Sequence, residues 1–327
     1  WMTIDLKVLA NNRDALLLVE VVALLHDVGK LSSLFIDQQS NQPSTNSQGF
    51  EHERAVQRIN GFVDNQFLQN LQSGRLQAIL NFTLIPNNKR IGQVLDLILH
   101  HDRSNHSAFL VQLLNRCDGV DSGADKGTTR SQGLPPAAKQ PFNDTFIATT
   151  FGKEDPKLWV DTANIDNIRQ KLSNKIGERL DPKVFLGKAK RNRLEILQMV
   201  RCAYQRGLGE TRRSANDVNL WDHSFSVATL YKTSLATLLL CNRLLDINHL
   251  RWRLLRVNFD VLGLYAKAIK IADLLGYQRV VDEACETVKQ LVEEEYPLGN
   301  EIYRDSTGIY FTFPDLDLPA DLAQEIR

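Results

Sequence analysis

The distribution of apolar and polar positions predicts a mostly helical N-terminal third. Residues 15–25 are almost continuously apolar, as in a buried helix, although Glu20 interrupts the run. Further helical patterns begin near residues 51 and 71 and extend over residues 91–118. The Pro-, Ser- and Asn-rich segment 37–50 predicts a surface loop, and residues 119–133 contain mostly small polar side chains that predict the end of helical structure.

The remainder of the chain changes its period after an irregular middle. Residues 134–180 show no clean period and contain several prolines, which predicts a linker with short elements. Strand-like alternation then involves Leu255, Val257, Phe259 and Val261. Helices are expected over residues 220–245, 265–275 and 280–296, and β-rich runs at 301–304 and 309–313 flank a polar turn that ends at Gly308.

These elements predict an α+β protein. The order strand, helix, helix, hairpin matches the front half of a ferredoxin-like or palm domain, and the elements of the second half are not found before Arg327. We therefore expect a mainly helical domain at residues 1–130, a linker with a basic helical segment at 131–215, and an incomplete palm-like domain at 216–327.

Composition adds limits on function. The 327 residues balance 39 Lys and Arg against 39 Asp and Glu, which argues against coating nucleic acid by bulk charge. The four cysteines form no Cys-x-x-Cys pair, so neither a disulfide framework nor a thiolate zinc site is expected. No uninterrupted apolar run reaches the ~18 residues of a membrane span, and no basic leader precedes an apolar core. We expect a reduced, cytoplasmic protein without membrane contact.

Residues 183–213 form the most basic stretch of the chain. Its acidic residues are Glu195 and Glu210. Its basic residues are Lys183, Lys188, Lys190, Arg191, Arg193, Arg201, Arg206, Arg212 and Arg213. The stretch is either a solvated helix face or a track for a phosphate backbone, and the sequence leaves both interpretations open.

The strongest local signal for chemistry is the segment LLHDVGK at residues 24–30. An apolar helix there delivers His26 and Asp27 side by side, and a carboxylate next to a buried apolar run requires neutralisation. A divalent metal ion provides it, because it binds imidazole nitrogen and carboxylate oxygen together. Lys30 follows closely enough to reach a phosphate group.

Other candidate ligands fall on the inner faces of expected helices. Asp118 continues the apolar stripe formed by Leu110, Leu113, Leu114 and Cys117. His100 and His101 follow the helical pattern of Val94, Leu95 and Ile98, and His101 falls on its inner face. Neighbouring helical side chains diverge by about 100°, so only one of the two histidines is expected to face inward. His52 is a further candidate, and five of the seven histidines lie between residues 26 and 106.

The pair Asp222–His223 has two interpretations. It suggests a second metal site, but Asp222 is more simply explained as the N-cap of the long helix that begins there.

The His26–Asp27 pair, the further histidines and the late Asp118 resemble the pattern of the HD phosphohydrolase superfamily. In that family a histidine also precedes the His-Asp pair, and here none does at the usual distance. This departure points to one branch. The segment CDGVDSGADK at 117–126 resembles the end of the HD domain in the large subunit of type III CRISPR effector complexes. The segments NDVNLWDHS at 216–224, VNFDVLGL at 257–264 and YPLGN at 296–300 resemble its first palm region.

This resemblance implies an RNA-guided antiviral complex of the prokaryotic cytoplasm. Its partners are the other effector subunits, guide RNA and target RNA, and its HD domain cuts single-stranded DNA with divalent transition metals. Imidazole ligands favour manganese, nickel, cobalt or iron over magnesium. The implied catalytic residues are His26, Asp27, Lys30 and Asp118. The implied metal ligands are His26, Asp27, His52, His100, His101 and Asp118.

The family's palm makes cyclic oligoadenylate through a Gly-Gly-Asp-Asp hairpin. The corresponding turn here, residues 304–308 (RDSTG), lacks the paired glycines, so we expect a scaffolding palm without cyclase activity. Two alternatives remain open at this point. One is a non-catalytic scaffold subunit of the same complex, and the other is a free-standing HD hydrolase that acts on nucleotides.

Overall fold

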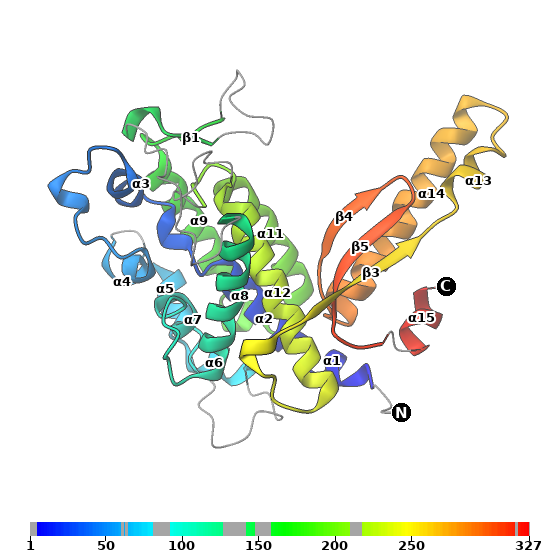
Figure 1. Cartoon of the computed structure of the whole chain (residues 1–327), viewed down its shortest axis with the longest axis horizontal. Helices are drawn as coiled ribbons and strands as arrows, with labels where there is room; N and C mark the ends of the chain where they lie inside the picture. The colour runs from blue at the N-terminus through cyan, green and yellow to red at the C-terminus, as the bar shows by residue number, and fades with distance from the viewer. Residues whose placement is uncertain are drawn as a thin grey trace. The chain divides into compact units, whose positions relative to one another are not determined.

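The computed structural model describes residues 5–59, 62, 65–80, 92–126, 142–147, 158–209, 218–317 and 320–326. The fold is α+β, as the sequence predicts, with many helices and two small antiparallel sheets (Figure 1). It contains two compact units. The helical unit comprises the described residues between 18 and 228, and the sheet unit comprises residues 5–17 and the described residues from 229 onward.

These units divide the chain near residues 17 and 228, whereas the sequence places boundaries at 130 and 215. The identities of the domains stay predictions.

The helical unit is built around apolar helices that pack together. Its α-helices are α2 (Arg13–Leu24, which begins in the sheet unit), α3 (Ser33–Gln39), α4 (Ala55–Arg58), α5 (Gln66–Leu71), α6 (Gly74–Ile79), α7 (Asp96–Leu99), α8 (Phe109–Lys126), α9 (Ile165–Arg179), α10 (Pro182–Phe185) and α11 (Ala189–Tyr204). Its shorter elements are the 3-10 turns η1 (Val28–Lys30), η2 (Thr45–Ser47), η3 (His52–Arg54) and η4 (Phe142–Asp144), and the strand pair β1 (Phe146–Ile147) and β2 (Leu158–Trp159). The apolar stretch of α2 and the predicted inner face of α8 are buried.

Two predictions for this unit are wrong. Helix α8 continues through the small polar residues after Asp118 as far as Lys126; residues 127–133 lie outside the described part of the chain. The expected linker at 134–180 contains α9, which buries Ile165, Leu172 and Ile176 along one face. Their spacings of seven and four residues are helical, but the charged residues between them obscured the pattern.

The charge within the apolar run of α2 has a buried partner. Glu20 and Arg193 of α11 form a two-pronged ion pair, with 2.8 Å from Arg193 Nε to Glu20 Oε2 and 2.7 Å from Arg193 Nη2 to Glu20 Oε1. Both side chains are only 1% exposed. Arg193 therefore belongs neither to a solvated face nor to a phosphate track, whereas Arg191, two residues away, is exposed. Arg212 and Arg213 lie outside the described residues.

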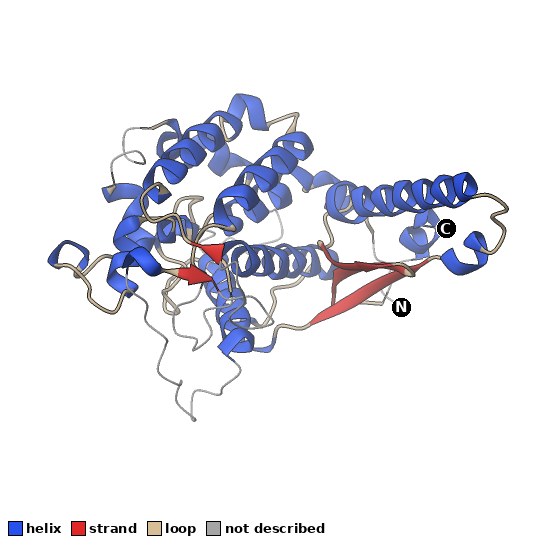
Figure 2. Ribbon diagram, turned by 90° about the horizontal axis from the view of Figure 1, so that it is seen from above, coloured by secondary structure: helices blue, strands red, loops and turns tan. Residues whose placement is uncertain are grey.

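The sheet unit contains a three-stranded antiparallel sheet in the order β3-β5-β4. Its elements are α1 (Lys7–Asn11), the greater part of α12 (Leu220–Cys241), η5 (Ile247–His249), β3 (Trp252–Asn258), α13 (Val261–Tyr265), α14 (Ile271–Gln290), the π-helical turn η6 (Leu291–Glu295), β4 (Glu301–Asp305), β5 (Gly308–Pro314) and α15 (Ala320–Ile326). Helix α14 runs alongside the sheet (Figure 2) and is joined to β4 by ion pairs, including one of 2.7 Å between Arg304 and Glu286.

The predicted hairpin is confirmed, since β4 and β5 pair as far as Asp305 and Gly308. The predicted strand ends earlier than expected, because Asp260 caps α13 by accepting a hydrogen bond of 3.0 Å from the Gly263 amide. Phe259 and Val261 are consequently outside β3. The helix expected over 265–275 is interrupted, since α13 ends at Tyr265 and α14 begins at Ile271.

Helix α12 ends at Cys241, four residues before the predicted end. By length and composition it is long and apolar enough to cross a membrane. However, 78% of its most apolar window is buried within the fold, and a core helix of a soluble protein passes the same test.

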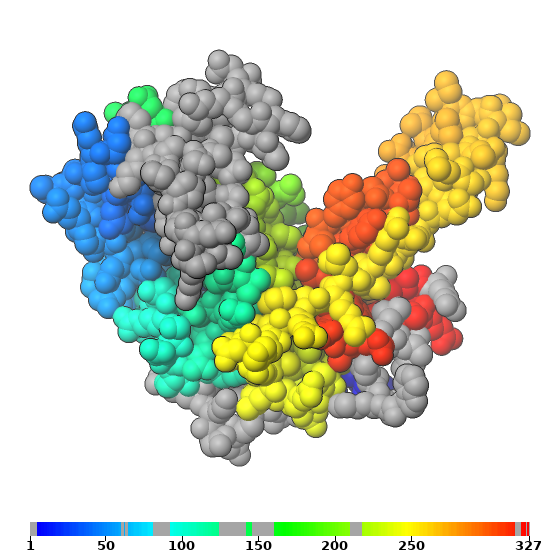
Figure 3. Space-filling view, viewed as in Figure 1, coloured from blue at the N-terminus to red at the C-terminus, as the bar shows by residue number. Residues whose placement is uncertain are grey.

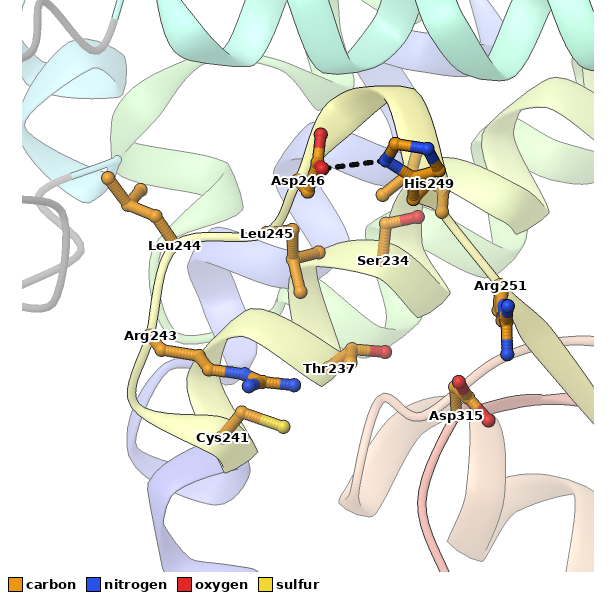
Figure 4. A pocket seen from close by; sticks show the side chains of 11 residues that line it. Ser234, Thr237, Cys241, Arg243, Leu244, Leu245, Asp246, His249, Arg251 and Asp315 are labelled. Carbon is orange, nitrogen blue, oxygen red and sulfur yellow. Dashed lines mark hydrogen bonds and ion pairs between the residues drawn. The ribbon is translucent and has the colours of Figure 1, made fainter.

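Exposed apolar side chains gather on α13 and the start of α14, at the end of the sheet unit that is coloured yellow to orange in Figure 3. They include Leu262, Ile269, Ile271 and Leu275, which are 58–90% exposed. Elsewhere in the same unit, a pocket of about 260 Å³ is lined by the end of α12, the following loop and Asp315 (Figure 4). It contains the ion pair Asp246–His249 but none of the predicted site residues.

Candidate metal centre

The site begins where α2 ends. After Leu24 the chain turns into η1, and Asp27 occupies the position before that turn without using its side chain as a cap. The Asp27 carboxylate is therefore available for other contacts, although it is almost completely buried. The apolar helix thus delivers His26 and Asp27 into the core of the helical unit, as the sequence predicts.

Gly29 allows His52 to approach this turn. A Cβ atom added to Gly29 would lie 1.9 Å from the His52 carbonyl oxygen and 2.7 Å from Ala55 Cβ. Only glycine permits this approach, which places His52 Nε2 3.0 Å from Asp27 Oδ1.

We expect the substitution Gly29→Ala to weaken both the fold and the site, because η1 and η3 must separate. The cost is about 1–3 kcal/mol in the free energy of unfolding, as for other overpacked sites, accompanied by loss of metal affinity. Chemical denaturation and metal titration measure the two effects. The control is Gly276→Ala in α14, where an added Cβ meets nothing within 4 Å and the helix gains about 0.5–1 kcal/mol. Equal behaviour of the two variants would contradict the role of Gly29.

Four imidazole rings surround the Asp27 carboxylate with their Nε2 atoms. His52 and His101 lie 3.0 and 3.4 Å from Oδ1, and His26 and His223 each lie 3.2 Å from Oδ2. Two atoms that each bind one ion at about 2.1 Å lie roughly 3.0–3.4 Å apart when the angle between them is between octahedral and tetrahedral. The observed distances fall within this range, which overlaps with ordinary hydrogen-bond lengths, so the spacing is compatible with ligand atoms around a shared cation.

The opposite nitrogen of each ring is also occupied. His26 Nδ1 donates to the Ala23 carbonyl at 2.7 Å, and His101 Nδ1 donates to the Ile98 carbonyl at 2.8 Å. His223 Nδ1 donates to Asp121 Oδ2 at 2.7 Å, and His52 Nδ1 lies 3.3 Å from Glu53 Oε1. Such partners fix the ring and direct the Nε2 lone pair at the centre, as they do in metal sites.

Asp118 joins the group through His223. Its Oδ1 atom lies 3.3 Å from His223 Nε2 and accepts a hydrogen bond of 3.1 Å from Ser122. Histidine 223 is in the first turn of α12, and its helix is brought to the end of α11 by a hydrogen bond of 2.8 Å from the Leu220 amide to the Gly207 carbonyl.

The predicted role of Asp222 as N-cap is wrong. Helix α12 begins at Leu220, and the side chain of Asn219 accepts a hydrogen bond of 2.9 Å from the Asp222 amide. The cap therefore lies three residues earlier than expected. His223, in the first turn of this helix, faces Asp27 and Asp118.

Charge at the centre is strongly negative while the imidazoles are neutral. Four carboxylates, from Asp27, Asp118, Asp121 and Glu53, face one ammonium group, from Lys30. Lys30 Nζ lies 2.6 Å from Asp27 Oδ2 and donates to the Gly209 carbonyl at 3.3 Å. A divalent cation among these groups would largely balance the charge.

Titration of the buried groups reflects this imbalance. Burial alone raises the pKa of Asp27, but the positive charges of His26 and Lys30 outweigh it and hold that pKa well below its ordinary value. Burial alone lowers the pKa of His223, but the adjacent carboxylates of Asp118, Asp121 and Asp27 raise it well above the usual value. The carboxylates thus attract positive charge to the centre, in the form of a proton or a metal ion.

Several polar atoms at the centre lack a hydrogen bond of good geometry within the described residues. They are buried and comprise His26 Nε2, His223 Nε2 and both oxygens of Asp27. Unsatisfied buried groups are costly, and a missing ion is one of their ordinary explanations. The donor set of imidazole nitrogen and carboxylate oxygen fits a divalent transition metal, and the grouped residues include His26–Asp27–His101, His26–Asp118–His223 and His52–Glu53–His101.

His100 does not join this centre. Its ring stacks on His106 with a centroid separation of 5.1 Å, while His101 next to it faces Asp27. The sequence argument that only one of the two histidines points inward is consistent with this geometry, and His101 is the one. Asn115 of α8 holds His101 in place by donating a hydrogen bond of 2.7 Å to its carbonyl oxygen.

The centre is buried on one side and open on another. His26, Asp27, His101 and His223 are at most 4% exposed. The side chains of Lys30, His52 and Asp118 are 15–24% exposed and form the accessible rim. A pocket of about 210 Å³ is lined by His52 together with Glu51, Glu53, Arg54, Asp102 and Arg103.

Sequence reasoning missed three members of the centre, namely His223, Asp121 and Glu53. His223 follows His26 by almost 200 residues, and it was considered only for a second, separate site. A possible signal was the absence of a histidine before the His26–Asp27 pair, which left one position of the resembled pattern unfilled. The structure places His223 beside the His26–Asp27 pair, from a later helix.

Comparisons with known proteins identify neither a family nor a function for this chain. The chain matches no family model, no curated protein and no solved structure. The function must therefore be argued from the site itself.

Proposed function

We propose that this protein is a metal-dependent phosphodiester hydrolase that cuts single-stranded DNA, as the large subunit of a type III CRISPR effector complex. The observation that carries the hydrolase proposal is the convergence of four Nε2 atoms on Asp27 at 3.0–3.4 Å. Manganese, nickel, cobalt or iron bound there would act as a Lewis acid on a phosphodiester and lower the pKa of water. The CRISPR part of the proposal rests on the sequence resemblance.

The residues of the centre divide into three roles. The proposed metal ligands in the buried part of the centre and beside it are His26, Asp27, His101, His223 and Asp118. The partly exposed His52 is a sixth proposed ligand. Asp121 and Glu53 orient His223 and His52. Lys30 stabilises the negative charge that develops on phosphate oxygens, since its ammonium group lies at the rim of the cluster.

The sheet unit supports the palm part of the proposal. Its three strands follow the order strand, two helices, hairpin, with the third strand between the first two, as in the front half of a ferredoxin-like domain. The β4–β5 turn contains no paired glycines, and Asp260 is engaged as a helix cap. We propose that this unit is a scaffold that contacts neighbouring subunits, for which the exposed apolar side chains on α13 and α14 provide a surface.

Cleavage of single-stranded DNA by the purified protein tests the proposal. We expect cleavage with Mn²⁺ or Ni²⁺, little cleavage with Mg²⁺, and loss of at least about 1,000-fold in rate for Asp27→Asn, which removes a ligand charge at the centre. The matched control is Asp246→Asn, which also removes a carboxylate paired with a histidine but at the exposed Asp246–His249 pair. Equal cleavage by the wild type and Asp27→Asn would remove the enzyme proposal.

The same assay separates the alternatives. Turnover of mononucleotides without cleavage of DNA would indicate a free-standing nucleotide hydrolase. Copurification of guide RNA and other subunits without any hydrolysis would indicate a scaffold subunit.

Replacing Lys30 is expected to change metal affinity and the rate of DNA cleavage in different directions. Replacing Lys30 by methionine removes the ammonium group that lies 2.6 Å from Asp27 Oδ2, so metal affinity is expected to stay equal or rise. Cleavage is expected to fall about 100-fold at saturating metal, because a group that stabilises charge in the transition state is lost. Metal titration and single-turnover kinetics measure the two effects. A fall in metal affinity instead would show that Lys30 supports the fold of the centre.

A further inference from the structure

The first turns of α12 carry two aromatic rings that stack on each other. Trp221 and Phe225 are four residues apart and therefore share one face of the helix. Their ring centroids lie 4.9 Å apart, with an angle of 21° between the ring planes, and both residues are half-buried. Part of this aromatic surface therefore remains in contact with solvent.

An arginine from the end of α11 lies over this pair. The guanidinium carbon of Arg201 is 5.9 Å from the centroid of the Trp221 ring, within the range of cation–π contacts. Arg201 is exposed, and its guanidinium forms no ion pair with any residue that the structure describes. The carboxylate of Asp222, next to Trp221 in the chain, accepts a hydrogen bond of 2.7 Å from the Asn219 amide instead. The positive charge of Arg201 is thus available to an anionic ligand.

The stacked rings lie on the same turn of α12 as the proposed metal ligand His223. Two residues along a helix correspond to about 200° around its axis, so Trp221 points outward while His223 points at the centre. The separation between the rings and the centre is therefore on the order of one helix diameter, about 10–12 Å. The chain just before Trp221 is bridged to the loop after α11, where the Gly209 carbonyl accepts a hydrogen bond of 3.3 Å from Lys30 at the rim.

Aromatic rings beside an unpaired arginine are the chemistry that binds single-stranded nucleic acid. Each unpaired base offers a flat π-face that stacks on an aromatic ring or on a guanidinium plane, and a positive charge attracts the phosphate backbone. Bases within a duplex stack on one another, so they do not offer these faces. Proteins of this type contact about 4–16 nucleotides, which is long enough to extend from a phosphate at the metal to the far side of one helix.

We infer that Trp221, Phe225 and Arg201 form a base-stacking platform that holds the single-stranded DNA substrate beside the metal centre. This inference rests on the proposed function and deepens it, because it assigns the selectivity for unpaired bases to three residues that bind no metal. It also gives one end of the basic stretch at residues 183–213 a role in binding DNA, whereas Arg193 within that stretch is committed to the core.

Binding of two oligonucleotides by the metal-free protein tests the platform without cleavage. One is thymidine DNA of about 16 nucleotides, and the other has the same backbone with abasic sites in place of the bases. Because the backbones are equal, the charge of the metal-free centre cancels in the ratio of the two affinities. We expect the wild type to bind the normal DNA about 5- to 150-fold more tightly, as for one base stacked on an aromatic ring.

The substitution Trp221→Leu keeps an apolar side chain and removes the π-face. It should lower this ratio of affinities at least about 5-fold and leave the affinity for abasic DNA unchanged. The matched control is Tyr303→Leu in the sheet unit, which also removes a ring from a stacked pair, 5.4 Å from Tyr310, and is 58% exposed. This control should leave the ratio unchanged.

Arg201→Ala is a second variant, and it removes an exposed side chain without entering the core. It should weaken the binding of both oligonucleotides and reduce the slope of log affinity against log salt concentration by about 0.7, the value for one lost phosphate contact on a single strand. If Trp221→Leu fails to fold, this variant decides the inference, and an unchanged affinity and salt slope would overturn it.

The remaining outcomes separate the platform from the proposed function. A ratio in Trp221→Leu equal to that of the wild type would overturn the platform, and so would an equal fall of the ratio in Tyr303→Leu. Wild-type protein that binds single-stranded DNA but does not cut it with Mn²⁺ would remove the proposed function only, since the ratio still decides the platform. Wild-type protein that binds no single-stranded DNA would overturn both together.

Discussion

Replacing His223 by alanine is expected to lower the affinity of the protein for Mn²⁺ or Ni²⁺ by more than about 100-fold. This exceeds the loss seen for groups that merely orient ligands, because His223 Nε2 is placed to bind between Asp27 and Asp118, at 3.2 and 3.3 Å. Metal titration and metal content of the purified protein measure the loss. Metal that binds the folded state also stabilises it, by about 2.7 kcal/mol at 100 times the dissociation constant. The variant should therefore lose the rise in melting temperature that metal causes in the wild type.

The matched control is His249→Ala. His249 has the same bond to a carboxylate as His223, 2.7 Å from its Nδ1 to Asp246, but its side chain is 79% exposed and no other site residue is near it in the described structure. This variant should retain metal affinity. If His223→Ala retained it as well, the long-range part of the centre would be wrong and the ligands would come from the N-terminal residues alone.

Sequence reasoning placed much of this centre because the relevant patterns are local. An apolar helix that ends in His26 and Asp27, and a carboxylate at Asp118 on an apolar helical stripe, both signal a buried charge that requires a cation. His101 was placed on an inner face by helical spacing. His223 could not be placed in the same way, because its role depends on how α12 returns to the end of α2, and such tertiary contacts leave no periodic trace in the sequence.

In the fold as well, elements that depend on neighbouring residues could be predicted from the sequence, whereas those that depend on distant contacts could not. The β4–β5 hairpin was predicted from a turn of four residues, and its register follows from that turn. The end of β3 was not predicted correctly. The side chain of Asp260 caps α13, so the strand does not continue through Phe259 and Val261 despite their alternating pattern. Helix α9 was missed because only three of the six buried residues on its inner face, Ile165, Leu172 and Ile176, have large apolar side chains. Glu20 signalled a buried partner, but nothing near it identifies Arg193.

Breaking the buried pair between Glu20 and Arg193 is expected to lower the free energy of unfolding by about 3–5 kcal/mol. Arg193→Met leaves the Glu20 carboxylate buried without its two-pronged partner, and Glu20→Gln leaves the guanidinium without a counter-charge. Both side chains are 1% exposed, so water cannot replace the lost contacts without opening the core. Urea denaturation of the metal-free proteins measures the effect.

Two further variants show that burial, and not the mere presence of an ion pair, causes this loss. Arg191→Ala on the same helix breaks an exposed pair with Glu195 at 2.8 Å and should cost less than about 1 kcal/mol. The double variant Glu20→Leu/Arg193→Met replaces both charges by apolar groups and should recover most of the stability lost by either single variant. If the double variant were as unstable as the single ones, the cost would come from altered packing between α2 and α11, because no unpaired charge remains in it.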